Sequence, residues 1–277
     1  MKLREKQIAV ITGAASGIGL ALVEALLRRG LSVAMLDIEA EPLEANCRRL
    51  AQAGGDVLAV RTDVRSFADF ERARDRVLAR FGRIDFVCNN AGVKLPFGPL
   101  WEVDPEGWKW LCSVNQDGVF YGMRAFAPLL VEQGSGHMVN VASMTGVTIV
   151  PHNSAYNATK HAVVALSNSL QSDLQAAGVD VGVTVVCTGQ VRTPLRDGAG
   201  RTSQHGVTVE APRPPVDAAK APPLEPSDVA RMIVEGVELD RSYVFTNPGA
   251  GERIWERVIG MVSDLTPEHY LSHQRAI

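Results

Sequence analysis

Several features that would point to a particular class of protein are scarce or missing in this chain of 277 residues. No cysteine belongs to a C-x-x-C pair, so the sequence predicts neither a zinc site nor a disulfide framework; the four cysteines are Cys47, Cys88, Cys112 and Cys187. Isolated thiols are typical of a reducing compartment, so we expect a cytoplasmic protein that binds no metal. Cys88 and Cys187 lie within apolar segments, where a buried packing role is expected.

A surplus of basic residues is also absent, because the formal net charge is -3. A chain without such a surplus has little means to neutralise phosphates, which argues against nucleic acid as the main partner. No apolar run reaches the length of a transmembrane helix, and the charged segment 1–6 does not resemble a signal peptide. We therefore expect a small-molecule substrate, and neither nucleic acid nor a membrane as partner.

Short apolar runs alternate along the chain with longer amphipathic segments. The runs predict buried strands at residues 7–12, 31–36, 57–61, 84–88, 137–142, 181–187 and 241–246. The other segments predict helices at 17–29, 39–53, 66–81, 105–130, 155–177, 225–239 and 251–264, of which 105–130 is one long helix or a helix pair. This alternation predicts a doubly wound, Rossmann-like α/β fold with a parallel sheet of about seven strands and helices on both faces.

Neither a second domain nor an internal repeat is evident, so residues 1–277 are expected to form one domain that binds ligands at the carboxyl ends of its strands. The alternation breaks after Thr193, and residues 197–224 are rich in glycine and proline. A long irregular segment in a compact domain is usually functional or disordered. We expect this one to form a substrate lid, and a passive surface insertion is the alternative.

A glycine-rich loop, TGAASGIG at residues 12–19, lies between the first predicted strand and the first predicted helix. Glycines allow a tight turn and a close approach of the backbone to a phosphate. The helix that follows points its amide donors and its positive dipole end at the same place. The G-x-x-x-G-x-G spacing in this setting predicts a binding loop for the phosphates of a dinucleotide.

Acidic and amide side chains follow the next predicted strands. Asp37 ends the second strand about 20 residues beyond the glycines, where a carboxylate binds ribose hydroxyls and repels the additional phosphate of NADP. No basic residue stands at Ser16 or Ile38 to offset this repulsion, so NAD is the predicted cofactor. After the third strand, Asp63 is placed to accept from the adenine amino group, and the small residues within 89–92 allow a nucleotide to lie flat.

Tyr156 and Lys160 stand four residues apart in a predicted helix, a spacing that puts both side chains on one face. A phenol is a poor acid or base near neutral pH because its pKa is about 10. A neighbouring ammonium favours the phenolate, so we expect Lys160 to lower the pKa of Tyr156. The pair is then able to exchange a proton with a substrate oxygen.

These patterns together resemble the classical short-chain dehydrogenase/reductase family over at least residues 7–195. The matching residues are TGxxxGIG at 12–19, Asp63, NNAG at 89–92, Asn115, Ser143 and YxxxK at 156–160. The resemblance implies a catalytic triad of Ser143, Tyr156 and Lys160, with Asn115 holding a proton-relay water. Ser143 would orient the substrate oxygen, Tyr156 would transfer the proton, and Lys160 would also hold the nicotinamide ribose.

The expected cofactor site combines the loop, the strand ends and the catalytic helix. Its residues are Gly13, Ser16, Gly17, Ile18, Gly19, Asp37, Ile38, Asp63, Val64, Asn90, Ala91, Gly92, Tyr156, Lys160, Val191 and Thr193. One departure from the family pattern is Thr188, which stands where the family usually has proline after the sixth strand. The backbone path past the nicotinamide is therefore expected to differ at residues 188–192, while Thr193 matches the family position near the carboxamide.

The substrate pocket is expected between residues 93–99, 144–153 and the proline-rich segment. Its mostly apolar side chains favour a bulky or aromatic substrate with few charges. The expected substrate contacts are Ser143, Thr145, Asn153, Tyr156 and Gln190. Residues 144–146 and 224–226 also resemble, more loosely, bacterial short-chain dehydrogenases that oxidise benzylic alcohols of lignin-type aryl ethers.

We therefore expect an NAD-dependent oxidoreductase that interconverts a secondary alcohol and a ketone. The alternatives are an NADPH-dependent carbonyl or 3-oxoacyl reductase, which Asp37 argues against, and a non-catalytic nucleotide-binding protein on the same fold. Helices near 105–130 and 155–177 are expected to carry apolar outer faces, with Phe120, Phe126 and Leu166 as candidates. The family resemblance implies a homodimer or homotetramer assembled there.

Overall fold

The computed structural model describes residues 1–197 and 222–263. Its centre is one parallel sheet of seven strands in the order β3-β2-β1-β4-β5-β6-β7, which confirms the predicted fold class. The strands are β1 (Ile8–Thr12), β2 (Ser32–Asp37), β3 (Val57–Arg61), β4 (Phe86–Asn89), β5 (Gly136–Val141), β6 (Val181–Cys187) and β7 (Tyr243–Phe245). Most of their residues are buried because helices cover both faces, so the strands are mostly apolar.

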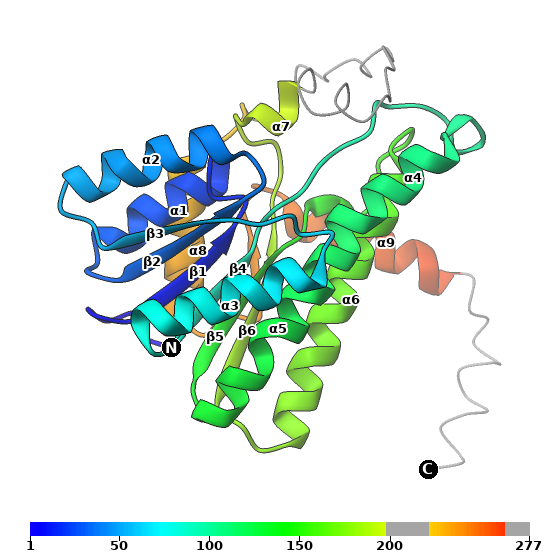
Figure 1. Ribbon diagram of the computed structural model, residues 1–277. Coiled ribbons are helices and arrows are strands. Elements are labelled where there is room, and N and C mark those ends of the chain that lie inside the picture. Colours follow the sequence, from blue (N-terminus) through cyan, green and yellow to red (C-terminus); the bar gives the residue numbers. More distant parts are fainter. Residues whose placement is uncertain (198–221, 264–277) are drawn as a thin grey trace.

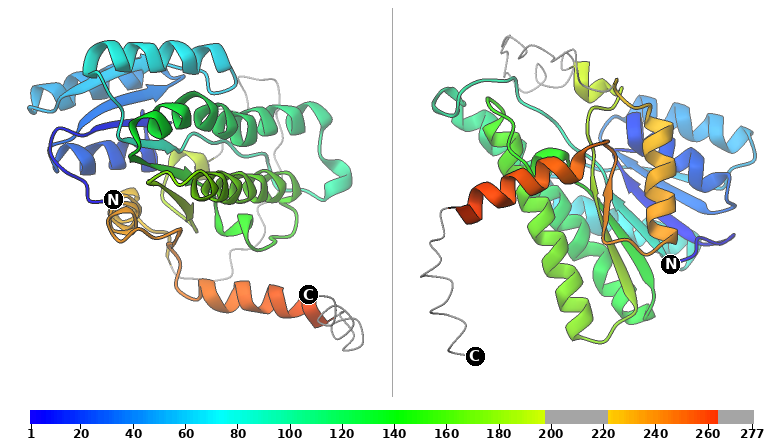
Figure 2. Two further views of the ribbon diagram at one scale, coloured as in Figure 1. Left: turned by 90° about the horizontal axis from the view of Figure 1, so that it is seen from below. Right: turned by 180° about the vertical axis from the view of Figure 1, so that it is seen from behind.

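The long helices divide into two layers. One face of the sheet is covered by α1 (Gly17–Leu27), α2 (Ala40–Gln52) and α8 (Pro226–Glu238), and the other by α3 (Phe67–Phe81), α5 (Gly118–Gln133) and α6 (Ser154–Ala176) (Figure 1). In the view from behind, α9 (Ala250–Ser263) extends away from the body of the molecule (Figure 2). Four shorter elements, η1 (Leu100–Glu102), α4 (Pro105–Cys112), η3 (Met144–Gly146) and α7 (Pro194–Asp197), lie in the connections.

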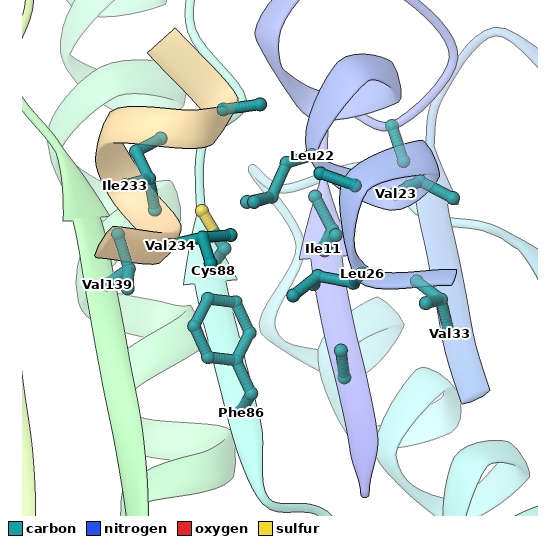
Figure 3. Packing of buried hydrophobic residues seen from close by; sticks show 14 of the residues in the cluster. Ile11, Leu22, Val23, Leu26, Val33, Phe86, Cys88, Val139, Ile233 and Val234 are labelled. Atoms are coloured by element: carbon teal, nitrogen blue, oxygen red, sulfur yellow. The ribbon is translucent and has the colours of Figure 1, made fainter. Parts of the chain in front are cut away.

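The core between the sheet and the helices α1 and α8 explains the apolar periodicity of these two helices. Leu22 and Leu26 are one turn apart on α1 and point toward the sheet, as do Ile233 and Val234 of α8 (Figure 3). They close over Phe86 of β4, and all five side chains are fully buried. At about 25 cal/mol per Å² of apolar surface, each such side chain stabilises the fold by about 1.5–3 kcal/mol.

The segment predicted as a long helix or a helix pair is interrupted at its middle. A π-helical turn, η2 (Ser113–Asp117), lies between α4 and α5. Phe126 of α5 is fully buried and meets Phe70 of α3 edge to face, with ring centroids 6.1 Å apart. The prediction that Phe126 faces outward is therefore wrong, since this turn of α5 packs against α3, while Phe120 is 47% exposed.

All four cysteines are free, and Cys88 and Cys187 are buried in β4 and β6 as expected of packing residues. Burial raises the pKa of the Cys88 thiol, which makes it a poor nucleophile. Among the described residues, no helix is long and apolar enough to cross a membrane. Most of the predicted lid, residues 198–221, lies outside the described part of the chain.

A buried histidine, His137, lies at the amino end of β5. This is the end of the strand opposite to the one where a ligand is expected to bind. The Nε2 atom of His137 is 2.8 Å from Thr184 Oγ1, and this hydroxyl donates to the Arg241 carbonyl. Nε2 is therefore the donor, and Nδ1 has no hydrogen-bond partner among the described residues. Protonation would place an unpaired donor in the core, and burial accordingly lowers the pKa of His137 from 6.5 to about 4.

This histidine makes stability depend on pH in a defined window. The unfolded chain binds the proton below pH 6.5 while the folded chain resists it down to about pH 4, so stability falls as pH drops through this range. We expect a loss of about 2 kcal/mol in the free energy of unfolding between pH 7 and pH 5, measured by urea denaturation. His137→Gln should remove this part of the slope, and His152→Gln, at an exposed histidine, is the control. An unchanged slope in His137→Gln would contradict the assignment.

Candidate active site

The carboxyl ends of β1, β2, β3, β4, β5 and β6 meet along one cleft. The side chains that line it come from these strand ends, from α6 and from the segment after β6. Fourteen of the sixteen residues predicted to bind cofactor line the cleft: Gly13, Ser16, Gly17, Ile18, Asp37, Ile38, Asp63, Val64, Asn90, Ala91, Gly92, Tyr156, Lys160 and Thr193. Gly19 and Val191 do not line it.

The glycine loop is packed so closely that its glycines leave little room for a side chain. Gly13 has φ of +66°, and a Cβ atom there would lie 2.8 Å from Asn90 Nδ2. A Cβ atom at Gly19 would lie 2.1 Å from the Gly13 carbonyl oxygen. The loop leads directly into the amino end of α1 at Gly17, whose φ of +56° also favours glycine. This concave backbone, open to the cleft at a helix amino end, fits a phosphate-bearing ligand.

Asp37 closes the same end of the cleft from the tip of β2. Its Oδ2 accepts from the Ala15 amide at 2.9 Å, and its Oδ1 accepts from the Glu39 amide at 3.1 Å. Each oxygen keeps a second lone pair for a further donor. The carboxylate is 5% exposed, so its position is fixed by the fold before any ligand binds.

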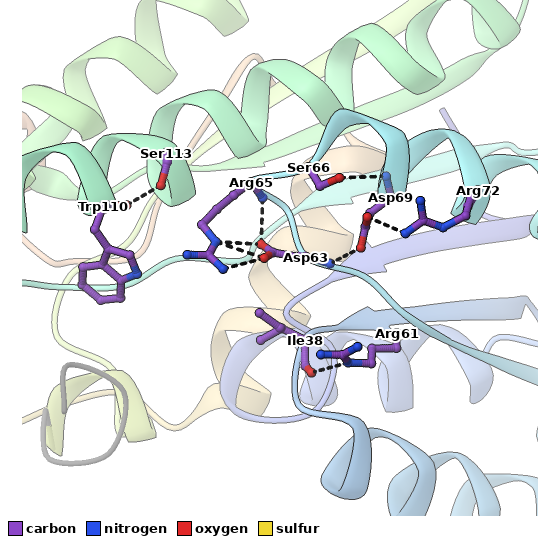
Figure 4. Close-up of polar contacts among 9 residues, drawn as sticks. All are labelled: Ile38, Arg61, Asp63, Arg65, Ser66, Asp69, Arg72, Trp110 and Ser113. Atoms are coloured by element: carbon purple, nitrogen blue, oxygen red, sulfur yellow. Dashed lines mark hydrogen bonds and ion pairs between the residues drawn. The ribbon is translucent and has the colours of Figure 1, made fainter. Parts of the chain in front are cut away.

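Two arginines at this end were not predicted as site residues. Arg65 donates to both carboxylate oxygens of Asp63, at 2.9 Å and 2.6 Å, and Arg61 donates to the Ile38 carbonyl (Figure 4). Partial burial alone would raise the pKa of the Asp63 carboxyl, but the hydrogen bonds and charge of Arg65 outweigh it and lower that pKa. Arg61 lies opposite Asp37 in the β2–β3 pairing and lines the cleft, which no local sequence signal indicated.

The segment after β4 is attached to the glycine loop by Thr12. The Thr12 hydroxyl accepts from the amides of Asn90 and Ala91, at 2.9 Å and 3.1 Å. In return, Asn90 Nδ2 donates to the Thr12 carbonyl at 2.8 Å. These hydrogen bonds join the ends of β1 and β4, and they fix the backbone that forms the floor of the cleft.

Three of the predicted catalytic side chains come together at the other end of the cleft. Tyr156 and Lys160 lie on α6, and the Lys160 Nζ atom is 5.7 Å from the centroid of the Tyr156 ring. Nζ also donates to the Val141 carbonyl at the end of β5, at 2.8 Å. Ser143, just beyond β5, lies close enough to Tyr156 for its hydroxyl to lower the pKa of the phenol. A serine hydroxyl, a phenol and an ammonium thus converge on one point.

Burial decides the ionisation of this group. It raises the pKa of Tyr156, and the nearby Ser143 hydroxyl opposes the rise, so the net shift is upward and not the net lowering that the spacing to Lys160 predicted. Burial and then the positive charge of Lys94 lower the pKa of Lys160 to about 8. While it is protonated, the phenol is suited to donate a hydrogen bond to a substrate oxygen. To accept a proton from an alcohol it must first lose its own, which a positively charged ligand nearby favours.

Asn115, the fourth predicted catalytic residue, lies in the π-helical turn and is fully buried. Its Oδ1 accepts from the Val93 amide at 2.8 Å, and its Nδ2 donates to the Val93 carbonyl at 2.9 Å. A Cβ atom on Gly92 would lie 3.4 Å from Asn115 Oδ1 and 3.7 Å from Lys160 Nζ. Asn115 therefore fixes the loop after β4, and it faces the same small space as the lysine.

Thr188, which replaces the family proline, takes part in the site. Its carbonyl accepts from the Met144 amide at 2.8 Å and from the Ser143 hydroxyl at 3.3 Å. Its side chain lines the cleft. The backbone at Thr188 thus supports Ser143, and the threonine introduces no break in the strand end.

Of the five residues predicted to contact substrate, only Tyr156 lines the cleft, so Ser143 and the other three lie outside its lining. Thr145 is buried, and its hydroxyl has no hydrogen-bond partner among the described residues. Asn153 pairs through its backbone with Gly98, which joins the two loops expected to border the pocket. Gln190 is exposed and holds Leu224 through its backbone carbonyl. Trp110 and Val114 line the cleft instead. They lie one helical turn apart just before Asn115, and this spacing was the sequence signal that could have predicted their place in the site.

Comparison with known proteins assigns the chain to a family. The family model described as short chain dehydrogenase matches residues 7–204. The chain belongs to the short-chain dehydrogenase family. Its relatives include 1-deoxy-11-beta-hydroxypentalenate dehydrogenase of Streptomyces exfoliatus, 38% identical over 252 residues, which cover 90% of this chain and 86% of that protein. The 3beta-hydroxysteroid dehydrogenase 2 of Eggerthella lenta is 34% identical over 202 residues, or 73% of this chain and 77% of the other.

A solved structure agrees with this assignment. The short chain dehydrogenase/reductase of Burkholderia phymatum in complex with NAD is 33% identical, with a TM-score of 0.87 over 96% of this chain and 98% of the other. This short-chain dehydrogenase is thus an NAD(P)-dependent oxidoreductase that acts on a CH–OH group of a small-molecule substrate. The expected class of enzyme is confirmed.

Proposed function

We propose that this short-chain dehydrogenase oxidises a bulky, mostly apolar secondary alcohol to a ketone with NAD, with Tyr156 as the general acid and base. The observation that carries the proposal is one cleft that joins Tyr156 and Lys160, with Ser143 close by, to an end that fits a dinucleotide. A bound nicotinamide supplies the hydride acceptor. The protein's own residues hold the alcohol and move its proton.

Each of the three residues has a separate task in this proposal. The Ser143 hydroxyl is held by the Thr188 carbonyl and the Thr145 amide and lies near Tyr156, so it orients the alcohol oxygen. In its phenolate form, Tyr156 takes the proton from that oxygen as the carbon loses hydride. Lys160, anchored on Val141, stabilises the phenolate before it takes the proton, because a charge in a buried site is screened little by water.

The substrate wall next to Tyr156 favours an apolar skeleton. Val93, Leu111, Val114 and Ala155 form a buried cluster with Tyr156, and Leu95, Val103 and Trp110 pack against it. The names of the two relatives denote a hydroxylated acid and a hydroxylated steroid, which fit such a wall. The looser resemblance to enzymes of benzylic aryl ethers remains a prediction within the same proposal.

The test is a panel of aryl, alicyclic and steroid secondary alcohols incubated with NAD or NADP, followed by the absorbance of the reduced dinucleotide. Reduction of NAD by bulky secondary alcohols, with formation of the ketone, is the expected result. The proposal fails if no secondary alcohol reduces either dinucleotide while a titration shows that the dinucleotide binds. That outcome would favour a non-catalytic nucleotide-binding protein.

The choice of NAD depends on Asp37. Its fixed carboxylate is placed for a ribose diol and repels a phosphate, so kcat/KM with NAD should exceed that with NADP. Asp37→Ala removes the repulsion and leaves Arg61 across the β2–β3 pairing, so the ratio should fall by about tenfold or more. Glu39→Ala, at a neighbouring acid that also lines the cleft, is the matched control. A wild-type preference for NADP would contradict this prediction.

We also propose that the protein is a homodimer or homotetramer that associates through the outer faces of α5 and α6. Phe120 is 47% exposed on α5, and Leu166 of α6 is only partly buried. Pairing these faces between copies would bury the apolar surface. Light scattering at micromolar concentration should detect a dimer or tetramer, and a stable monomer would reject the proposal.

A further inference from the structure

The last described helix, α9, is attached to the helix that carries Tyr156 and Lys160. In the view from behind, α9 crosses α6 (Figure 2), and Arg257 of α9 donates a hydrogen bond to the Nε2 atom of His161 on α6. His161 directly follows Lys160 in the chain. A contact between residues 96 positions apart therefore lies next to the catalytic pair.

The two hydrogen bonds of His161 define the form of its imidazole. The Nδ1 atom lies 2.8 Å from the Asn157 carbonyl oxygen, which only accepts, so Nδ1 carries the hydrogen. Nε2 is then the acceptor for the Arg257 guanidinium, which only donates. His161 thus connects Arg257 to the backbone of Asn157, one turn earlier on α6.

Asn157 continues this connection into the loop 147–153, which joins η3 to α6. Its side chain is buried, and its Nδ2 donates to the Val150 carbonyl at 2.8 Å. Its Oδ1 accepts from the Val150 amide at 3.5 Å. Because Ser143 precedes η3 and Tyr156 lies in the first turn of α6, the loop joins the two residues proposed to hold the alcohol oxygen.

The same loop also pairs with the segment after β4. The His152 carbonyl accepts from the Gly98 amide at 2.9 Å. Earlier in that segment, Val93 and Leu95 belong to or pack against the buried cluster around Tyr156. The hydrogen-bonded connection that begins on α9 therefore ends at two segments that adjoin the reacting phenol.

We propose that Arg257, His161 and Asn157 are positioning residues that hold the loop 147–153 as a wall for the substrate skeleton, so that α9 sets the preference for bulky alcohols. This inference rests on the proposed function and names what determines substrate size at the same site. A loop that is fixed before binding loses little conformational freedom when a bulky skeleton packs on it. A small alcohol is held mainly through its oxygen and depends less on this wall.

The kinetic experiment compares the bulky panel alcohol of highest kcat/KM with cyclohexanol, a small alcohol of the same panel. Both are measured with NAD in the unaltered enzyme, Arg257→Met and His161→Phe. Two controls accompany them: His161→Gln, whose amide keeps one donor and one acceptor, and Arg253→Met, at an exposed arginine one turn earlier on α9.

The unaltered enzyme should prefer the bulky alcohol. Arg257→Met and His161→Phe should raise KM for the bulky alcohol about fivefold or more relative to KM for cyclohexanol, with a smaller effect on kcat. His161→Gln and Arg253→Met should keep the unaltered ratio. Equal kcat/KM for both alcohols in the unaltered enzyme would overturn the inference, and so would an equal rise of both KM values in Arg257→Met.

Hydrogen exchange tests the connection without any substrate. Backbone amides of the loop 147–153 should exchange about fivefold faster or more in Arg257→Met than in the unaltered protein. If the residues act as one connection, adding Arg257→Met to Asn157→Ala should change the exchange no further, whereas independent contacts would give additive effects. Unchanged exchange in Arg257→Met, or additivity, would overturn the inference. If no alcohol reduces either dinucleotide, the proposed function fails, and the exchange rates still decide whether α9 holds the loop.

Discussion

Tyr156→Phe is expected to lower kcat by about three orders of magnitude while dinucleotide affinity changes less than about twofold. The substitution removes one oxygen and keeps the ring, so the apolar cluster around Tyr156 and the packing of α6 are preserved. Only the proton-transferring hydroxyl is lost. The measurements are the initial rate of dinucleotide reduction and a titration of dinucleotide binding.

Tyr121→Phe provides the matched control, since it makes the same change on α5, where the ring packs against Phe67. It should leave kcat within about twofold, because no reacting group is touched. A Tyr156→Phe enzyme with near-normal kcat would remove Tyr156 from its proposed role. Loss of dinucleotide binding in the same variant would instead assign the phenol a binding role.

Gly19→Ala is expected to have the largest effect on the nucleotide end of the cleft. A Cβ atom at this position would lie 2.1 Å from the Gly13 carbonyl oxygen and 2.7 Å from Asn90 Nδ2, so the glycine loop must move away from α1. Overpacking of this kind costs about 1–3 kcal/mol or more. We expect the free energy of unfolding to fall by about 3 kcal/mol and dinucleotide affinity to fall by about tenfold or more.

Gly260→Ala makes the same substitution inside another helix, α9, at a position where a Cβ atom would meet nothing within 4 Å. Because alanine favours helix more than glycine, this variant should be unchanged or more stable by about 0.5–1 kcal/mol. Urea denaturation and dinucleotide titration of both variants separate close packing in the loop from the general effect of alanine. Unchanged affinity and stability in Gly19→Ala would show that the loop is not packed as described.

The strands and most of the cleft could be predicted because their signals are local. Each strand is a short apolar run bounded by polar residues or glycine, and the bounds of β3 and β6 agree with the prediction to the residue. The glycine loop was predictable for a similar reason, since its turns at Gly13 and Gly17 use positive φ. In a parallel sheet the carboxyl ends of these strands share one edge, so the residues that follow them line one cleft.

What could not be predicted depends on contacts between distant segments. The burial that raises the pKa of Tyr156 comes from the packing of residues such as Val93 and Leu111 around α6, which no four-residue spacing reveals. The outward direction expected for Phe126 failed because α3 packs there. Lys94 had no sequence signal at all, since its ammonium meets a ring from another part of the chain.

The most direct test of the central claim is transfer of label from the alcohol to the cofactor. A secondary alcohol from the panel that reduces NAD is prepared with deuterium on its carbinol carbon, and the reduced dinucleotide is analysed by mass spectrometry. If the cleft holds alcohol and nicotinamide side by side with Tyr156 on the oxygen, the deuterium appears in the reduced dinucleotide and the product is the ketone. Reduced dinucleotide without deuterium would contradict direct hydride transfer, and with it the function proposed for this site.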